Sequence, residues 1–376
     1  MTALQNLRWI LRTISESVEV LPAVGGAEED LVHPDFEERE DQIFDKDDLI
    51  FDTIFERDSL RRMPSLYRPV PSIGRIEKHF FRYFLDGSFR SYFLGTLLEN
   101  ERDTPVHFAQ VGACTLRRED DGTMRREVLQ MENVLLVAKG RLSEVLWTRL
   151  EKLASETGIK LVDITEKDTI SETLPDFDLR NKAAGKVRYV MHSLESEVIK
   201  EVLPKLSEDS WLIVDGSLLF NPTLDLLSKD GRIKPVIGVA KNFRKDPQFV
   251  FGRGPRAERY SIYKLLADLR TEHRTAAFSA RDGRVVFWYV RLREQKHLDY
   301  PLMGVVKVEL VNPSKEPVPT ELIDLISRTL VAERSVTPHG QDRRWHVHLY
   351  PIFLAECTVK ENFLSREVVH HFLKWR

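Results

Sequence analysis

Apolar residues recur at helical spacing near the amino terminus and gather into short uninterrupted runs through the rest of the chain. Over residues 3–20 they fall three or four positions apart, which predicts an amphipathic helix. Runs rich in β-branched and aromatic residues, bounded by turn residues, predict strands. The expected strands are 79–85, 91–98, 106–116, 134–138, 211–215, 231–239, 285–292 and 304–311. Further helices are expected over 142–157 and 187–206 and in a last segment that reaches Trp375.

The order of these elements predicts an α/β fold with a mixed sheet flanked by helices. Three strands separated by turn residues come first, and an antiparallel meander is their simplest arrangement. A helix then leads directly into the strand at 211–215. This order resembles the ribonuclease H-like core, in which the first and fourth strands lie side by side and parallel. Residues 119–185 are expected to be an insertion in that core.

The tripeptide Asp-Gly-Ser occurs twice, at 86–88 and at 215–217, each time after a hydrophobic run. Asp-Gly is also the commonest hairpin dipeptide, so a simple turn explains either copy alone. As a pair at two strand ends, Asp86 and Asp215 instead stand where an α/β sheet usually carries its site. We therefore expect the two carboxylates to share a divalent metal ion.

The helix over 187–206 offers a third carboxylate. Its apolar face has Glu195 at one edge, whereas Glu197 points further away and Glu201 lies on the opposite edge. Glu195 is the preferred choice, with an interfacial salt bridge as the alternative and with Glu197 and Glu201 left open. Three clustered carboxylates require a cation such as Mn²⁺ or Mg²⁺ to neutralise them. Such a centre predicts metal-dependent hydrolysis of phosphodiester bonds.

Basic side chains follow the predicted site along the chain. Lys241 ends the next strand and is expected to bind the scissile phosphate, unless it is only a solvated strand end. A loop that contains Gly and Pro carries Arg253, Arg256 and Arg259, and Arg291 lies near the end of a later strand. These four arginines are candidates for contacts with the phosphates of DNA, and an ordinary exposed loop is the alternative for the first three.

The charge is unevenly distributed. Residues 1–60 carry 5 Lys and Arg against 16 Asp and Glu, a net charge of −11, whereas the rest of the chain has a net charge of +8. A basic body suits an anionic ligand such as nucleic acid. The acidic part is a solvated arm or a docking segment, and its interleaved Ile and Phe residues favour docking. We therefore expect an acidic, partly helical amino-terminal segment at 1–72 and the main domain at 73–376.

Several function classes are disfavoured. No Walker motif or nucleotide-binding glycine fingerprint is present, so work driven by ATP must come from a partner. Cys114 and Cys357 lack metal-ligand spacing and are expected in the core. His346 and His348 have no third ligand nearby and are expected at the surface. Without a signal peptide or a long apolar segment, the protein is expected to be cytoplasmic and free of membrane contact.

Together these features resemble the NurA family of DNA repair nucleases. The matching pieces are Asp86-Gly-Ser88, a helix glutamate, Val214-Asp215-Gly-Ser-Leu218, Ile237-Gly-Val-Ala-Lys241, Trp288-Tyr-Val-Arg-Leu292 and Tyr350-Pro351 with Leu354. They span most of the chain, and their common order is more telling than any single piece. One departure is Thr358, which stands where the family often has a histidine eight residues after the tyrosine.

The resemblance implies a Mn²⁺-dependent nuclease with a ribonuclease H-like core that acts on single strands and duplex ends. It also implies a homodimer that works with the hexameric ATPase HerA in the processing of DNA ends. By position, Asp86, Glu195 and Asp215 match the metal-binding acids, and Lys241 and Tyr350 match the family's strand-end lysine and tyrosine. Two alternatives stay open: a DNA-binding adaptor that no longer cleaves, and a related enzyme that acts on RNA or on a structured junction.

Overall fold

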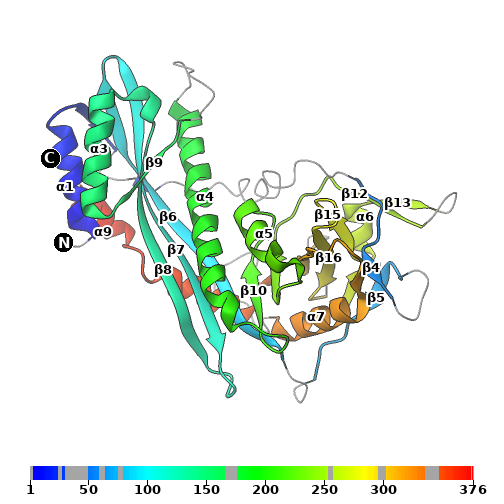
Figure 1. Cartoon of the computed structure of the whole chain (residues 1–376). Helices are drawn as coiled ribbons and strands as arrows, with labels where there is room; N and C mark the ends of the chain where they lie inside the picture. The colour runs from blue at the N-terminus through cyan, green and yellow to red at the C-terminus, as the bar shows by residue number, and fades with distance from the viewer. Residues whose placement is uncertain are drawn as a thin grey trace.

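The computed structural model (Figure 1) describes residues 3–23, 28–29, 50–58, 64–74, 79–165, 176–252, 257–294, 302–334, 347–373 and 375. Its helices are α1 (Ala3–Ser15), α3 (Glu144–Thr157), α4 (Asp176–Val202), α5 (Asn221–Ser228), α6 (Ile262–Ala267), α7 (Thr320–Glu333), α8 (Tyr350–Lys360) and α9 (Arg366–Phe372). Its strands are β1 (Glu19–Pro22), β2 (Glu28–Glu29), β3 (Ile50–Phe51), β4 (Glu56–Arg57), β5 (Tyr67–Pro69), β6 (Phe81–Glu99), β7 (Arg102–Arg118), β8 (Met124–Val137), β9 (Lys160–Asp163), β10 (Trp211–Asp215), β11 (Val236–Ala240), β12 (Gln248–Phe251), β13 (Glu258–Ser261), β14 (His273–Thr275), β15 (Phe278–Ala280), β16 (Val285–Arg291), β17 (Val305–Val311) and β18 (Val318–Pro319).

A large mixed sheet connects most of these strands. Its main path follows the order β5-β14-β16-β17-β11-β10-β6-β7-β8-β9. At its centre, β10 runs parallel to both β6 and β11, while β7 lies antiparallel between β6 and β8. The prediction of an α/β fold with a mixed sheet flanked by helices is confirmed. The predicted parallel pairing of the strand that carries Asp86 with the strand that carries Asp215 is also confirmed.

The first two predicted strands are in fact one long strand. β6 pairs with β7 on both sides of Asp86 and Gly87 without a break at these residues. Gly87 does not adopt the positive φ that a type I′ hairpin turn would require. The chain turns instead at Asn100 and Glu101, whose φ values are 50° and 63°. The predicted turn after Asp86 is therefore wrong, and this acid lies inside a strand.

Other boundaries differ because tertiary pairing extends the elements beyond their apolar runs. β7 and β8 are longer than predicted since each pairs along most of its length with a neighbour. Helix α4 begins at Asp176, before the predicted start. The last predicted helix is two helices, α8 and α9. The hairpin predicted over 285–292 and 304–311 is confirmed as β16 and β17.

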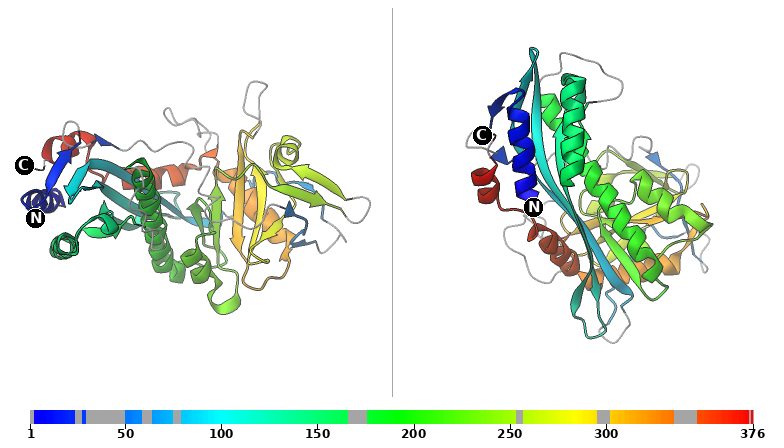
Figure 2. Two further views of the ribbon diagram at one scale, coloured as in Figure 1. Left: turned by 90° about the horizontal axis from the view of Figure 1, so that it is seen from above. Right: turned by 60° about the vertical axis from the view of Figure 1, so that its left-hand side comes forward.

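Helices cover both faces of the central strands (Figures 1 and 2). On one face, Leu194 and Val198 of α4 pack in a common apolar cluster with Leu85 of β6. On the other face, Val359 of α8 packs with Cys114 of β7. The two layers therefore bury apolar side chains of the long strands on opposite faces of the sheet.

The two ends of the chain meet at one end of the molecule (Figures 1 and 2). Leu7 and Ile10 of α1 share an apolar cluster with Leu150 of α3 and Trp375. The predicted first helix is thus confirmed, although it ends at Ser15. At the opposite end of the molecule, β3 pairs with β12, β4 pairs with β18 and β5 pairs with β14. The described parts of the acidic segment therefore lie against the body of the protein.

None of the helices in the described ranges combines enough length with enough apolar character to cross a membrane. Helix α4 is the longest at 27 residues. Its buried apolar residues pack against the sheet, and it carries charged residues along its length.

Candidate active site

Asp86 and Asp215 lie beside each other on neighbouring parallel strands. The register of β6 and β10 places Val214 opposite Leu85, so the acids that follow these two residues are adjacent. Cross-strand partners share a face of a sheet. Asp86 is paired with Cys114, which packs under α8, and it therefore faces that helix. The two acids that the repeated tripeptide singled out are thus brought together.

Lys241 joins this pair from the next strand. Asp215 lies opposite Val239 in the parallel pairing of β10 with β11, and Lys241 comes two residues later on the same side. Its Nζ atom is 2.7 Å from Oδ2 of Asp215, and only 8% of the lysine side chain is exposed. The alternative of a solvated strand end is therefore wrong, because Lys241 forms a partly buried ion pair.

Glu195 approaches from the α4 side of the sheet. Gly87 makes room for it: a Cβ atom at position 87 would lie 2.3 Å from Oε1 of Glu195. The other carboxylate oxygen is 2.8 Å from Nδ1 of His192, one turn earlier on the helix. Glu195 is buried. Its carboxylate therefore occupies the space that the glycine of the first Asp-Gly-Ser tripeptide leaves open.

The other two candidate helix acids point away from the site. Glu197 is exposed and forms an ion pair with Lys200 on the surface of α4. Glu201 is also exposed, and its Oε2 accepts a hydrogen bond of 3.2 Å from the side chain of Gln130. Of the three alternatives that the sequence left open, Glu195 is the one that reaches β6, where it lies over Gly87 next to Asp86.

The pKa of Asp86 is shifted by burial and by the charges of its neighbours. Burial raises the pKa of Asp86 well above its ordinary value, the negative charge of Asp215 raises it further, and the positive charge of Lys241 lowers it. Glu356 and Glu195 raise the pKa of Asp86 as well. Without a cation, the buried carboxyl group of Asp86 therefore favours its protonated form.

Glu356 of α8 is a member of this charge cluster that the sequence did not reveal. Its helix lies against the face of β6 that carries Asp86, and its carboxylate forms an ion pair with Lys360. In the sequence, the only sign of this role is that Glu356 belongs to the segment that begins at Tyr350. Tyr350 begins α8 and is about half exposed, and Thr358 donates a hydrogen bond to the carbonyl of Leu354 in the same helix.

The chemistry of these side chains fits a hard divalent cation. Carboxylate oxygens are the preferred ligands of Mg²⁺ and also suit Mn²⁺. Asp86, Asp215 and Glu195 supply such oxygens, and the burial of the first explains why a cation is needed to keep it charged. In their present rotamers, no three acidic, histidine or cysteine side chains of the described ranges converge tightly enough to hold an ion.

The predicted DNA-contact arginines are spread over different settings. Arg259 is exposed on β13, which lies at one end of the molecule, whereas β10 lies near its middle (Figure 1). Arg253 and Arg256 lie outside the described residues. Arg291 is buried, and its guanidinium donates hydrogen bonds to the carbonyls of Leu269, Met303 and Leu266 at 2.6, 2.7 and 2.6 Å. Burial also lowers the pKa of Arg291. The expected phosphate contact of Arg291 is incompatible with this burial, and the residue instead ties loops together.

His348 and the two cysteines differ in their burial. His348 is buried, so its predicted surface position is wrong, and His346 lies outside the described residues. Cys114 is buried as predicted, whereas Cys357 is partly exposed. Burial raises the pKa of the Cys114 thiol to about 12. A thiol in this state is a poor nucleophile, so Cys114 is a packing residue beneath α8.

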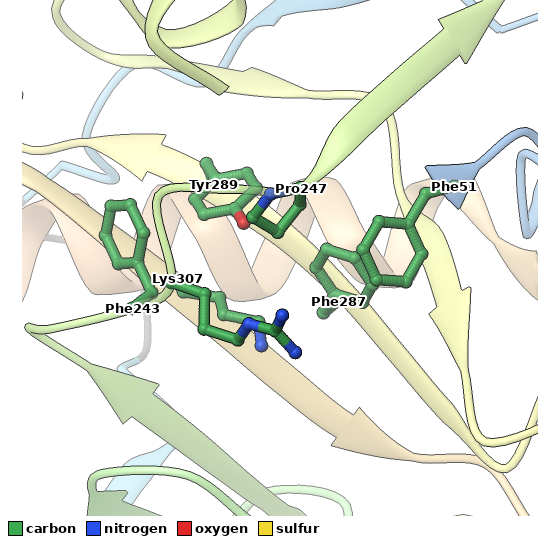
Figure 3. A pocket seen from close by; sticks show the side chains of 7 residues that line it. Phe51, Phe243, Pro247, Phe287, Tyr289 and Lys307 are labelled. Carbon is green, nitrogen blue, oxygen red and sulfur yellow. The ribbon is translucent and has the colours of Figure 1, made fainter. Parts of the chain in front are cut away.

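A pocket lies beside Phe243, which comes two residues after Lys241 in the chain (Figure 3). It encloses about 240 Å³, including the space at its mouth, and is lined by Phe51, Phe243, Arg244, Pro247, Phe287, Tyr289 and Lys307. The ring centroids of Phe51 and Phe287 are 4.8 Å apart, and those of Phe243 and Tyr289 are 5.0 Å apart. Its aromatic walls belong to the apolar core on this side of the sheet.

A scan against protein-family models and a search of curated proteins both found no match to the chain.

Proposed function

We propose that the chain is a metal-dependent DNA nuclease that hydrolyses phosphodiester bonds of single strands and duplex ends. The observation that carries this proposal is the adjacency of Asp86 and Asp215 on two parallel strands. Lys241 pairs with Asp215 at the end of β11, and Glu195 of α4 lies over Gly87, the residue after Asp86. Clustered acids of this kind, next to a lysine, suit Mn²⁺ or Mg²⁺ and a phosphate group.

The strand order supports a ribonuclease H-like core for this nuclease. The strands β8, β7 and β6 form an antiparallel meander, and β10 and β11 continue the sheet parallel to β6. Helix α4 directly precedes β10, as the helix before the fourth strand does in such a core. Because β8 belongs to the meander, the insertion expected at 119–185 shortens to the stretch between β8 and α4.

In this proposal the side chains divide the work of phosphodiester hydrolysis. Bound metal ions would activate a water molecule and hold the leaving oxygen. Asp86 would lose its proton as it became a ligand, and Asp215 and Glu195 would supply further oxygens. Lys241, now 2.7 Å from Asp215, would turn to the phosphate and stabilise its growing negative charge. Tyr350 is proposed as a substrate contact at the start of α8.

The proposed setting follows from the NurA resemblance. We propose that the chain acts as a cytoplasmic homodimer, with a HerA-type hexameric ATPase that supplies the work driven by ATP. The sequence offers no nucleotide-binding fingerprint of its own, which supports the need for such a partner. The acidic segment at 1–72 is the proposed docking or dimer region, and the basic remainder is the proposed DNA-facing part.

One observation favours a second candidate, a DNA-binding adaptor that does not cleave. The ammonium group of Lys241 already neutralises Asp215, with an Nζ to Oδ2 distance of 2.7 Å. In a silent relative, a lysine in this position would replace the metal ion as the counter-charge. The Thr358 departure from the family histidine points the same way, since its hydroxyl bonds within its own helix.

Cleavage of end-labelled DNA separates the two candidates. Purified protein is incubated with single-stranded and duplex DNA in the presence of Mn²⁺, Mg²⁺ or EDTA. We expect metal-dependent cleavage that falls at least about 100-fold in Asp215→Asn. Asp225→Asn is the matched control, because this acid is 73% exposed and pairs with Arg284 at the surface. DNA binding without cleavage in any condition would favour the adaptor and contradict the nuclease.

A further inference from the structure

Glu309 on β17 is a fully buried acid outside the cluster described above. Its Oε2 atom accepts hydrogen bonds from the hydroxyl of Ser217 and the amide of Leu218, each at 2.8 Å. Its Oε1 atom lies 2.8 Å from Nζ of Lys307. Burying a carboxylate is costly unless it is paired and hydrogen-bonded. These three partners therefore explain how Glu309 is kept inside the protein.

The two hydrogen bonds fix the turn that follows Asp215. Strand β10 ends at Asp215, and Gly216 continues the chain with a φ of 106°, a conformation that favours glycine. Gly238 faces Glu309 in the pairing of β11 with β17. A Cβ atom at Gly238 would lie 2.8 Å from the carbonyl oxygen of Gly216. The turn is thus held between a glycine on one strand and a buried carboxylate on the next.

Lys307 supplies the charge that balances Glu309. Its side chain is 7% exposed, and its ammonium group lies 4.8 Å from the ring centre of Phe287. It pairs across the strands with Ala240, the residue before Lys241. Figure 3 shows the Lys307 side chain among the aromatic walls of the pocket. The ion pair therefore links this pocket to the turn after Asp215.

We propose that Glu309 is a positioning residue for the metal site. It holds Ser217 and Leu218 so that the carboxylate of Asp215 faces Asp86. Without these bonds, the last hydrogen bond that the sheet makes to this backbone is the one from the Gly216 amide to the Val239 carbonyl. The inference rests on the proposed function, because it takes Asp215 to be a metal ligand.

Two double variants test this role, and both have uncharged side chains at positions 307 and 309. In Glu309→Gln with Lys307→Met, the amide oxygen still accepts the bonds from Ser217 and Leu218. In Glu309→Leu with Lys307→Met, the volume is similar and the site is equally uncharged, but no acceptor is left. The readouts are the Mn²⁺ dissociation constant, from the electron paramagnetic resonance of the free ion, and the amide exchange rate of the peptide 211–220.

We call the two double variants the Gln pair and the Leu pair after the residue at position 309. We expect the Gln pair to bind Mn²⁺ nearly as tightly as the wild type. The Leu pair should bind about 10-fold to 100-fold more weakly, the range typical of lost partners of metal ligands. It should also exchange faster over 211–220 at a temperature where both pairs are folded. Equal Mn²⁺ affinity and equal exchange in the two pairs would overturn the proposal, since a merely structural role lowers only the melting temperature.

A milder variant covers the case in which the Leu pair does not fold. Ser217→Ala removes one of the two donors, and Ser217→Thr restores a hydroxyl. We expect weaker Mn²⁺ binding in Ser217→Ala with recovery in Ser217→Thr, and wild-type affinity in both would contradict the role of Glu309. If the wild type itself binds no Mn²⁺, the proposed function fails, while the exchange rates of 211–220 still decide whether Glu309 holds the turn.

Discussion

At the scale of single residues, Gly87 is a position where one added methyl group would disturb the candidate site. Its Cβ atom would lie 2.3 Å from Oε1 of Glu195, so Gly87→Ala must displace this carboxylate. We expect cleavage to fall about 100-fold, the cost of a misplaced group. Steady-state cleavage of single-stranded DNA measures the effect. Gly185→Ala on α4 is the matched control, because nothing lies within 4 Å of its added Cβ atom. Full activity in Gly87→Ala would show that Glu195 takes no part.

The raised pKa of Asp86 predicts how stability depends on pH in EDTA. Burial, with Asp215 as the next cause, keeps a proton on folded Asp86 at pH values where the unfolded chain releases it. The resulting stabilisation is present below the ordinary pKa and is lost as the pH rises through the raised folded value. We expect Asp86→Asn, which cannot ionise, to be more stable than the wild type at about pH 8 and to show a flatter profile. Urea unfolding across this range is the measurement, with Asp225→Asn as the control. Parallel profiles for wild type and Asp86→Asn would contradict the charge account.

Single residues also show what the sequence can and cannot reveal about a site. Asp86 and Asp215 were predictable because a repeated tripeptide after two strands is visible in the chain. Glu309 left a weaker signal, a Lys-Val-Glu pattern within an apolar strand that is buried along its length. The prediction for Arg291 was wrong because its charge suggested DNA, whereas its burial depends on three carbonyl groups, those of Leu266 in α6, Leu269 just after it and Met303 before β17.

At the scale of elements, strand boundaries depend on neighbours as much as on local residues. The Asp-Gly dipeptide in β6 favours a turn by itself, but β7 pairs through it and β10 pairs up to it. The same pairing that removes the turn places Asp86 beside Asp215. Element types and their order were therefore predictable from periodicity, whereas the ends of β6, β7 and α4 were not.

A buried ion pair attaches one short element to the body. Glu56 of β4 and Arg274 of β14 are both fully buried, with a distance of 2.7 Å between Oε2 and Nη2. Glu56→Ala removes this charge and the acceptor of the Ala277 amide and the Thr320 hydroxyl, while Asp324 still lies 2.6 Å from Nε of Arg274. We expect the free energy of unfolding to fall by about 3 kcal/mol. Urea denaturation measures this loss. Asp52→Ala, at an exposed position in the same segment, should change it little. A loss in Glu56→Ala no larger than in the control would show that this segment is not anchored by the pair.

At the scale of the whole molecule, the acidic amino-terminal part is not a separable arm. Its described residues supply α1, which packs with α3 and Trp375, and β3 and β4, which pair with distant strands. Removal of residues 1–60 would therefore expose several apolar clusters, and point substitutions are the better probes of this part. The charge asymmetry was visible in the sequence, but the packing of its apolar residues was not, because that depends on partners far along the chain, as in the pairing of Phe51 with Phe249.

The central claim is that Asp86 and Asp215 belong to one divalent metal site, and Mn²⁺ binding tests it most directly. The loss of the free-ion electron paramagnetic resonance signal is followed as protein is added, for the wild type, Asp86→Asn, Asp215→Asn and the control Asp225→Asn. The account predicts saturable binding in the wild type and the control, with binding lost or strongly weakened in the other two variants. Equal Mn²⁺ binding in all four proteins, or none in the wild type, would contradict it.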